Sequence, residues 1–326
     1  MTLAMTLGWL ATVAAVGSSP RPAGTPARAQ EVKVTVLSTM LAGDPARGIG
    51  EWGFAALVEV DGRRFLFDTG ARPETVVRNA EELGIDLATV TDVILSHNHA
   101  DHTGRLLALR RSVSARNPAA LARAHVATGI FWSRAGQSGS AGERNGLLPI
   151  KAEYEALGGV FVEHRGPVEL APGVWLTGPV PRTHQERNWS GSLVVKAPEG
   201  DLEDTIPEDA SLAINTDQGI VLVSGCGHAG IINTVEHARG ILGGAPVHAA
   251  IGGFHLFAAS DDHLAWTAAR LKAARLGHFL GAHCTGVEAV YRIRELVGLP
   301  RRRAAVSAVG SSFTLGKGID ALALAG

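Results

Sequence analysis

One nonapeptide dominates this sequence: Ser96-His97-Asn98-His99-Ala100-Asp101-His102-Thr103-Gly104. It places three imidazoles and one carboxylate directly after the apolar stretch 90–95, which is typical of a buried strand. Imidazole and carboxylate are ligands that Zn²⁺, Mn²⁺ and Fe²⁺ accept in proteins. In an extended segment His97 and His99 point to the same side and can bind one ion, and Asp101 and His102 then turn toward a second ion. Two cations that share a water lower its pKa toward neutrality and create a hydroxide nucleophile.

Three further histidines follow apolar strands in the same way. His228 follows the expected strand 220–223, His255 follows 247–251, and His283 follows 279–280. Because polar groups at strand ends often converge in one crevice, we expect these loops to meet the nonapeptide. The remaining seven histidines are expected to be surface or packing residues on helices or scattered loops: His125, His164, His184, His237, His248, His263 and His278.

The chain has two cysteines, and both lie in these histidine loops, Cys226 beside His228 and Cys284 beside His283. Two cysteines exclude a disulfide-rich scaffold. Two alternatives stay open for the pair, namely a disulfide and two reduced thiols that line the site.

The pattern of apolar segments predicts a layered α+β or α/β domain in which two sheets pack between helices. The first half is rich in strands and the second half alternates strands and helices. Strands are expected at 32–37, 54–60, 64–68, 90–95, 126–131, 160–162, 174–176, 211–215, 220–223, 247–251, 279–280 and 312–315. Helices are expected at 74–83, 106–115, 231–242, 263–274 and 287–297, and the acidic segment 197–209 is expected to be an exposed loop.

Composition narrows the class of partner. The chain has 326 residues, 31 acidic and 30 basic, and a net charge of −1. A protein that binds nucleic acid or a membrane surface non-specifically needs a strong basic excess. We therefore expect a small-molecule substrate and no nucleic acid, and the sequence leaves the oligomeric state open.

The N-terminal segment 1–29 is expected to be a secretory signal peptide. Its apolar run 3–16 is too short for a standard membrane span, and Ala27-Arg28-Ala29 matches a cleavage site. This predicts a single domain over 30–326, a periplasmic or secreted location and no stable membrane insertion after cleavage. The absence of Lys or Arg before Arg21 is atypical of an export signal, so a cytoplasmic location remains the alternative.

The spacing within the nonapeptide resembles the signature of the metallo-β-lactamase-fold hydrolases. The resemblance implies an αββα sandwich, in which two mixed β-sheets pack face to face with helices on the outer faces. It also implies that His97 and His99 bind one ion and that Asp101 and His102 bind another. Asp68, in Leu66-Phe67-Asp68-Thr69-Gly70, would then orient the metal loop.

Later motifs are similar to a subgroup, the 7,8-dihydropterin-6-yl-methyl-4-(β-D-ribofuranosyl)aminobenzene 5′-phosphate synthase-like proteins. They are Thr177-Gly178-Pro179-Val180-Pro181-Arg182, Ser224-Gly225-Cys226-Gly227-His228-Ala229-Gly230, Gly252-Gly253-Phe254-His255-Leu256 and His283-Cys284-Thr285-Gly286. The chain departs from this pattern at two positions. Gly227 replaces the usual serine, and Cys226 stands at the strand end where the superfamily has an aspartate that bridges both metals.

The resemblance therefore leaves part of the ligand set open. It favours His228 as a ligand over Cys226, which would ligate, bridge or line the site as an inert thiol. His255 and His283 both remain candidates for the last ligand of the second metal. Cys284 is expected to line the site, and Arg182 to contact an anionic substrate.

These features predict a metal-dependent hydrolase with a metal-bound hydroxide at a dinuclear site. The resemblance to the subgroup implies a phosphate ester, a phosphodiester or a related small anionic molecule as the substrate. Asp101 and His228 are the expected catalytic residues, and Asp101 would orient the hydroxide. The expected cofactors are two divalent ions, with Zn²⁺ favoured and Mn²⁺ or Fe²⁺ as alternatives. The alternative functions are a non-catalytic metal-containing binding or sensor protein and a lactone or thioester hydrolase of the same fold.

Overall fold

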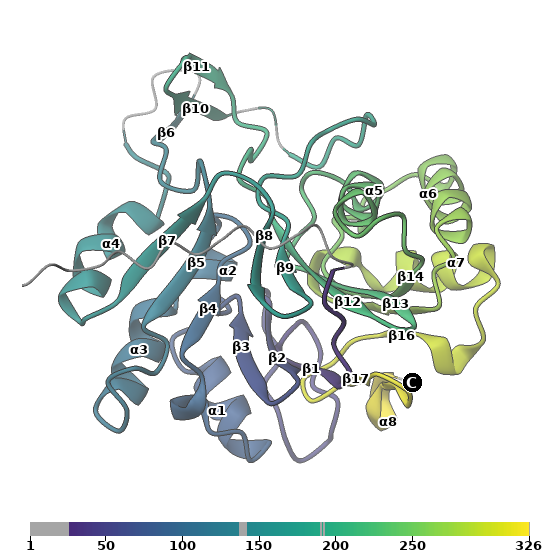
Figure 1. Cartoon of the computed structure of the whole chain (residues 1–326), viewed down its shortest axis with the longest axis horizontal. Coiled ribbons are helices and arrows are strands. Elements are labelled where there is room, and N and C mark those ends of the chain that lie inside the picture. The colour runs from purple at the N-terminus through teal and green to yellow at the C-terminus, as the bar shows by residue number, and fades with distance from the viewer. Residues whose placement is uncertain (1–25, 137–141, 190, 192, 326) are drawn as a thin grey trace, which may run out of the picture.

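Two mixed sheets pack face to face between two layers of helices (Figure 1). The computed structural model describes residues 26–136, 142–189, 191 and 193–325. The first sheet has the order β18-β17-β1-β2-β3-β4-β5-β7. Its strands are β18 (Gly318–Asp320), β17 (Ser312–Thr314), β1 (Val32–Ser38), β2 (Ala55–Val60), β3 (Arg63–Phe67), β4 (Asp92–Ile94), β5 (Arg123–Ala127) and β7 (Val160–His164).

The second sheet has the order β16-β15-β14-β13-β12-β9-β8. Its strands are β16 (Ala304–Val306), β15 (His278–Gly281), β14 (Val247–Gly252), β13 (Gly219–Ser224), β12 (Ser211–Thr216), β9 (Val174–Leu176) and β8 (Val168–Ala171). A separate small sheet, in the order β11-β10-β6, stands apart at the top of Figure 1. It consists of β6 (Arg134–Gly136), β10 (Leu193–Ala197) and β11 (Gly200–Glu203).

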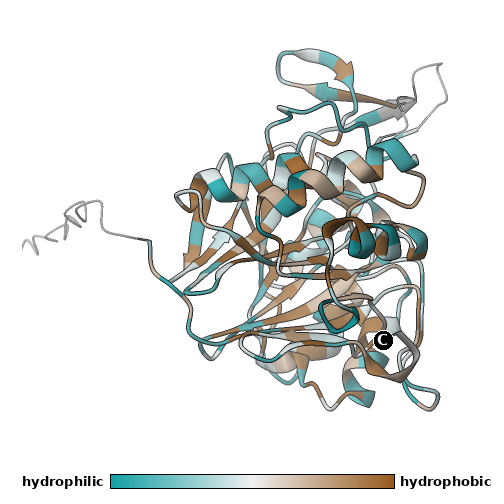
Figure 2. Cartoon of the chain, turned by 90° about the vertical axis from the view of Figure 1, so that its right-hand side faces the viewer, coloured by the Kyte–Doolittle hydropathy of each residue, from teal (hydrophilic) through white to brown (hydrophobic). Residues whose placement is uncertain are grey.

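Helices cover the outer face of each main sheet. On the first sheet they are α1 (Thr75–Glu82), α3 (Leu106–Ser114) and α4 (Leu147–Ala156), and on the second sheet α5 (Ile231–Ile241), α6 (Asp261–Ala273) and α7 (Val287–Val297). Two short helices, α2 (Ala100–Thr103) and α8 (Leu322–Ala325), complete the set in the described residues. Hydrophilic and hydrophobic residues alternate along the helices that face the viewer in Figure 2, as expected for helices with one face on a sheet.

A buried apolar layer joins the two sheets. Val34 and Phe67 of the first sheet share one core cluster with Val223 and Leu280 of the second. This arrangement is the αββα sandwich that the sequence predicts, and the prediction is confirmed.

Some expected elements differ from the structure. The strand expected at 126–131 is β5, which ends at Ala127, and the chain then turns. The helix α4 is not among the expected helices, and it contains Pro149 in its first turn, a position that proline tolerates. The four histidines His125, His164, His248 and His278 lie on strands rather than on helices or loops.

The prediction of an exposed loop at 197–209 is correct about the exposure of residues 198–203 and wrong about the rest. Part of this segment forms the strand β11, and Asp204, Glu208 and Asp209 are buried. Its acidic composition suggested a solvated loop, but an arginine distant in sequence neutralises two of these carboxylates in the interior.

The N-terminal predictions remain untested. Residues 1–25 lie outside the described part of the chain, and residues 26–29 lie against the hairpin of β12 and β13. There the buried Ala29 donates its N–H to the carbonyl of Asn215 at 2.8 Å. Within the described residues, none of the helices is long and apolar enough to cross a membrane.

Candidate metal centre

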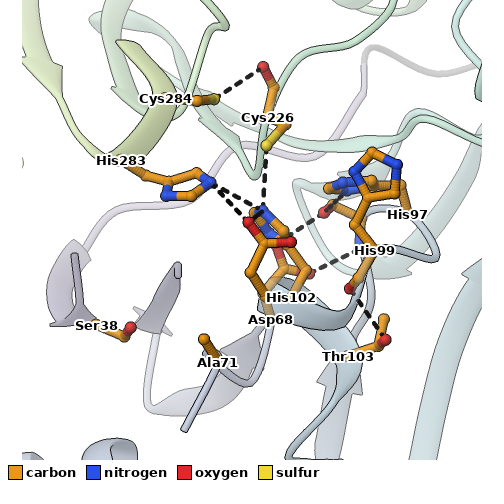
Figure 3. Close-up of polar contacts among 12 residues, drawn as sticks. Ser38, Asp68, Ala71, His97, His99, His102, Thr103, Cys226, His283 and Cys284 are labelled. Carbon is orange, nitrogen blue, oxygen red and sulfur yellow. Dashed lines mark hydrogen bonds and ion pairs between the residues drawn. The ribbon is translucent and has the colours of Figure 1, made fainter. Parts of the chain in front are cut away.

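Every histidine loop of the predicted site starts at the carboxyl end of a strand. The nonapeptide follows β4 in the first sheet, and the loops with His228, His255 and His283 follow β13, β14 and β15 in the second. The strands β3 and β4 are parallel, and so are β13, β14 and β15. Because carboxyl ends of parallel strands meet at one edge, all these loops converge on one crevice. Figure 3 shows His283 and Cys226 directed toward His102.

Three histidines form one group, here called the imidazole set: His97, His99 and His228. Their ligand nitrogens lie within 4.8 Å of one another. Their ring centroids are 4.5 Å (His97 to His99), 4.7 Å (His97 to His228) and 4.8 Å (His99 to His228) apart. Three imidazoles at this spacing match a common ligand group for Zn²⁺.

Hydrogen bonds fix which ring nitrogen is free in His97 and in His228. The Ser96 hydroxyl donates to the Asp68 carboxylate at 2.7 Å, so it accepts from Nδ1 of His97 at 2.9 Å. Nδ1 of His228 donates to the carbonyl of Asn188 at 2.5 Å. Nε2 of His97 and Nε2 of His228 are then unprotonated, buried and without a hydrogen-bonding partner among the described residues.

The imidazole set is electrically neutral at physiological pH. Burial, reinforced by the neighbouring histidines, lowers the pKa of His97 and of His228 well below the usual value. Burial also lowers the pKa of His99, to about 4. Since only the neutral imidazole binds a metal ion, these residues are already in the form that ligation requires.

A second group, here called the acidic set, contains Asp101, His102 and His283. Oδ2 of Asp101 lies 3.3 Å from Nε2 of His283 and 3.8 Å from Nε2 of His102. Burial opposes protonation of His102, but the Asp68 and Asp101 carboxylates outweigh it and raise its pKa to about 9. Burial also opposes ionisation of Asp101, yet the two histidines hold the pKa of this carboxyl below its usual range.

Asp68 supports both sets. Its buried carboxylate accepts from Nδ1 of His102 at 2.7 Å and from the Ser96 N–H at 2.8 Å, in addition to the Ser96 hydroxyl. It therefore orients His102 directly and His97 through Ser96. Gly225 makes room for this arrangement, because a Cβ there would lie 2.5 Å from the Asp68 carboxylate and 2.2 Å from the Ser96 hydroxyl.

Cys226 lies between the two sets. Its Sγ is 3.1 Å from Nε2 of His102. It also lies within 4.8 Å of ligand atoms in three groups, one with His97 and His102, one with His228 and His255, and one with His283 and Cys284. Both thiols are free and buried, and burial raises the pKa of Cys226 well above its usual range. Of the two alternatives for the cysteine pair, the structure has the reduced thiols.

The structure separates the two candidates for the last ligand. His283 lies with Asp101 and His102, whereas His255 lies with His228, at a ring-centroid distance of 4.6 Å. His255 also lines the cavity beside the site.

A buried ionic cluster holds the other side of the nonapeptide. Arg134 donates to Glu208 at 2.6 Å and to Asp204 at 3.0 Å, and all three side chains are buried. Glu208 also accepts from the backbone N–H of Asn98, between His97 and His99, at 3.2 Å. Burial raises the pKa of Glu208 to about 7, although Arg134 opposes this shift. This cluster has no local signal in the sequence, because Arg134 lies 70 positions from Asp204 and 74 positions from Glu208.

Arg182 does not line the cavity. Its guanidinium donates to the carbonyls of Thr205 and Ile206 and lies 5.6 Å from the Trp189 ring. It thus holds the segment before Glu208 in place, and the expected contact to an anionic substrate stays a prediction.

A cavity of about 630 Å³ opens onto the imidazole set. His99, His228 and His255 line it from the metal loops, and Trp189 and Phe257 line it further out. His263, which the sequence analysis assigns to the surface or to packing, also lines it. A cavity of this size fits a small organic molecule.

Comparisons with known proteins agree with this fold. The model of the metallo-β-lactamase superfamily matches residues 53–278. A curated relative from Methanocaldococcus jannaschii, 7,8-dihydropterin-6-methyl-4-(β-D-ribofuranosyl)-aminobenzene-5′-phosphate synthase, is 30% identical over 270 residues. The match covers 80% of this chain and 90% of the relative. The resemblance predicted from the motifs is confirmed.

Two solved structures are also similar. A metal-dependent hydrolase of the β-lactamase superfamily superposes with a TM-score of 0.64 at 25% identity, covering 82% of this chain and 93% of that one. The metallo-β-lactamase fold protein YhfI from Bacillus subtilis gives a TM-score of 0.52 at 13% identity, covering 87% and 100%, and this likeness shows the fold alone.

Proposed function

This chain belongs to the metallo-β-lactamase superfamily, and on that basis we propose that it is a metal-dependent hydrolase that cleaves phosphate esters or phosphodiesters of small molecules. One observation carries the metal requirement: Nε2 of His97 and Nε2 of His228 are buried without a hydrogen-bonding partner among the described residues. A buried polar atom without a partner costs about 1–3 kcal/mol. A cation bound by the imidazole set would satisfy both nitrogens.

The ligand chemistry supports one divalent ion in each set. Imidazoles, a carboxylate and a thiol are the groups that Zn²⁺ prefers, while Mn²⁺ favours oxygen ligands. An ion in the acidic set would displace the proton that His102 holds at neutral pH. We therefore propose two Zn²⁺ ions, with Cys226 close enough to both sets to contribute its sulfur. Asp68 would hold the rings of His97 and His102 in the orientation that binding requires.

When bound, such ions would polarise a phosphoryl oxygen and acidify a water molecule. The protein's own groups would orient the reactants. The side chain of Asp101 is 24% exposed, whereas His102 and His283 beside it are buried, so its carboxylate is accessible to accept a hydrogen bond from an attacking water. His228 lines the cavity, so the imidazole set would face a bound substrate at this residue.

One finding supports a phosphate-bearing substrate and another supports hydrolysis. The Methanocaldococcus jannaschii relative is named as the synthase of a compound that carries a 5′-phosphate, and a similar solved structure is described as a metal-dependent hydrolase. The cavity is large enough for a small phosphate ester. We also propose, from the sequence, a single domain over 30–326 and a periplasmic or secreted location after cleavage of 1–29.

The test is turnover by the Zn²⁺-loaded protein of chromogenic phosphodiesters, phosphomonoesters, lactones and thioesters. His99→Ala should reduce phosphodiester turnover by more than the 10–100-fold typical of residues that only orient a ligand. His164→Ala is the matched control, because His164 stacks on His125 outside both sets. If the protein turns over lactones or thioesters but no phosphate ester, the proposed substrate class is wrong. Bound metal without turnover of any substrate would favour a binding or sensor protein.

A further inference from the structure

Trp52 is a large aromatic side chain held half exposed by a fixed backbone. Trp52 is 51% exposed to solvent. On one side of it the buried Glu51 accepts from the Ser38 hydroxyl at 2.6 Å and from the Arg72 N–H at 2.8 Å. On the other side the buried Phe54 donates its N–H to the carbonyl of Asp101 at 3.2 Å. Trp52 is therefore exposed although hydrogen bonds of Glu51 and Phe54 hold the backbone on both sides of it.

The Trp52 ring stands against the acidic set. Its centroid is 4.7 Å from that of His283, and it meets Phe257 edge to face at 6.1 Å. Phe257 is 54% exposed and lines the cavity. It too is fixed, because its N–H donates to the carbonyl of Cys284 at 3.2 Å.

The close backbone contact at Phe257 requires glycine at position 286. A Cβ on Gly286 would lie 2.7 Å from Cα of Phe257, and the φ of Gly286 is 80°. Two aromatic rings are thus displayed to solvent from segments attached to the metal loops. Rigid, exposed aromatic residues that adjoin a cavity are typical of ligand contacts.

From this arrangement we infer that Trp52 and Phe257, here called the aromatic wall, bind a planar aromatic or heteroaromatic group of the substrate. The inference rests on the proposed function for the position of the phosphate, which would lie at the two ligand sets. The group would then pack on the free faces of the two rings. Offset or edge-to-face aromatic contacts favour such a ligand over an aliphatic one.

Trp189, which also lines the cavity, offers a less accessible aromatic surface. Its ring has the Arg187 guanidinium 5.2 Å away and that of Arg182 5.6 Å away. The Trp189 ring thus already makes cation–π contacts with two arginines of the protein. The aromatic wall, in contrast, keeps half of its surface open beside His283 and His255.

The experiment compares two substrates with the same leaving group, phenyl p-nitrophenyl phosphate and methyl p-nitrophenyl phosphate. The wild type should prefer the phenyl ester in kcat/KM. Trp52→Ala should reduce this preference about three- to tenfold, and Trp52→Phe should retain most of it. Phe257→Leu should also reduce it, and the ring contacts that this variant changes are those with Trp52 and His255. Tyr291→Ala is the control, because Tyr291 is an exposed aromatic residue on α7 whose ring contacts Arg294, whereas Trp52 contacts His283 and the cavity-lining Phe257.

A binding measurement separates the inference from the proposed function. Phenylphosphonate should bind the Zn²⁺-loaded wild type more tightly than methylphosphonate, and Trp52→Ala should abolish the difference. If neither ester is hydrolysed but this binding pattern holds, the proposed function fails and the aromatic wall stands. If the esters are hydrolysed but Trp52→Ala and Phe257→Leu both keep the phenyl preference, the inference is overturned. A change of oligomeric state in these variants without a change of preference would also overturn it, in favour of a protein contact.

Discussion

The two ligand sets share one crevice but differ in how they are stabilised. In the imidazole set, Nδ1 of His97 and of His228 is held by neutral groups, and Nε2 of each ring is buried without a partner among the described residues. In the acidic set, Asp101 and Asp68 already neutralise the charge of His102. The imidazole set therefore depends on a cation for its stability, while the acidic set is satisfied in part by its own charges.

The largest effect is expected from breaking the imidazole set. His228→Ala should reduce turnover by more than 100-fold, because it removes a ligand and a wall of the cavity together. The acidic set should keep its own ion, since Asp101, His102 and His283 are unchanged. Metal content and phosphodiester turnover measure both effects. Unchanged turnover with full metal content would show that His228 is not a ligand.

A smaller effect is expected from the residues that orient the ligands. Asp68→Asn should weaken metal binding by about 10–100-fold in both sets, because Asp68 contacts His102 directly and His97 through Ser96. Ser96→Ala should weaken the imidazole set alone. Chelator competition with each variant measures these affinities. If both substitutions weaken the metal affinity of both sets equally, Asp68 does not orient His102 independently of Ser96.

Cys226 sharpens the comparison because it lies between the sets. In the Co²⁺-loaded protein we expect a sulfur-to-metal charge-transfer absorption band that Cys226→Ser removes, with a loss of affinity of about tenfold. Cys284→Ser is the matched control and should keep the band, because among the described residues the Cys284 thiol belongs to one candidate ligand group, that of Cys226 and His283. Loss of the band in Cys284→Ser, with the band kept in Cys226→Ser, would show that Cys284 rather than Cys226 is the sulfur ligand.

The pH dependence of the metal-free protein should differ in sign between the sets. The pKa of His99 falls to about 4 on folding, so between pH 6.5 and 4 the unfolded chain binds more protons and stability decreases as pH falls. Each such histidine contributes about 1.4 kcal/mol per pH unit in this range. His102, with a pKa of about 9, contributes stability that is present below pH 6.5 and lost as pH rises through 9.

Chemical unfolding of the metal-free protein at several pH values measures these slopes. His99→Ala should unfold with a shallower dependence on pH between 6.5 and 4. An identical slope in the variant and the wild type would show that folding does not hold His99 in its neutral form.

Much of the site was predictable because its signals are local in sequence. The nonapeptide places its ligands by spacing alone, and parallel strands bring their carboxyl ends to one edge, which predicts the convergence of His228, His255 and His283. The choice between His255 and His283 was not predictable. Both follow parallel strands, both have a positive φ (49° and 45°), and only the three-dimensional path of each loop places His283 with Asp101.

The buried ionic cluster that contacts the nonapeptide at Asn98 was also not predictable from the sequence. Arg134 and Glu208 are 74 positions apart, and an acidic segment that is buried looks, in sequence, like one that is solvated. The exposure of Trp52 is equally nonlocal, because it depends on Glu51 and Phe54 being held by residues 71, 72 and 101. Such contacts follow from the fold and have no signal in the neighbouring sequence.

The central claim is that each ligand set binds one divalent cation, and metal content per chain tests it most directly. We expect two ions in the purified wild type, one in His99→Ala and one in His283→Ala, measured by elemental analysis after dialysis. The ion that remains should be the one in the intact set. A content near zero in the wild type, or a content that neither substitution lowers, would contradict the account.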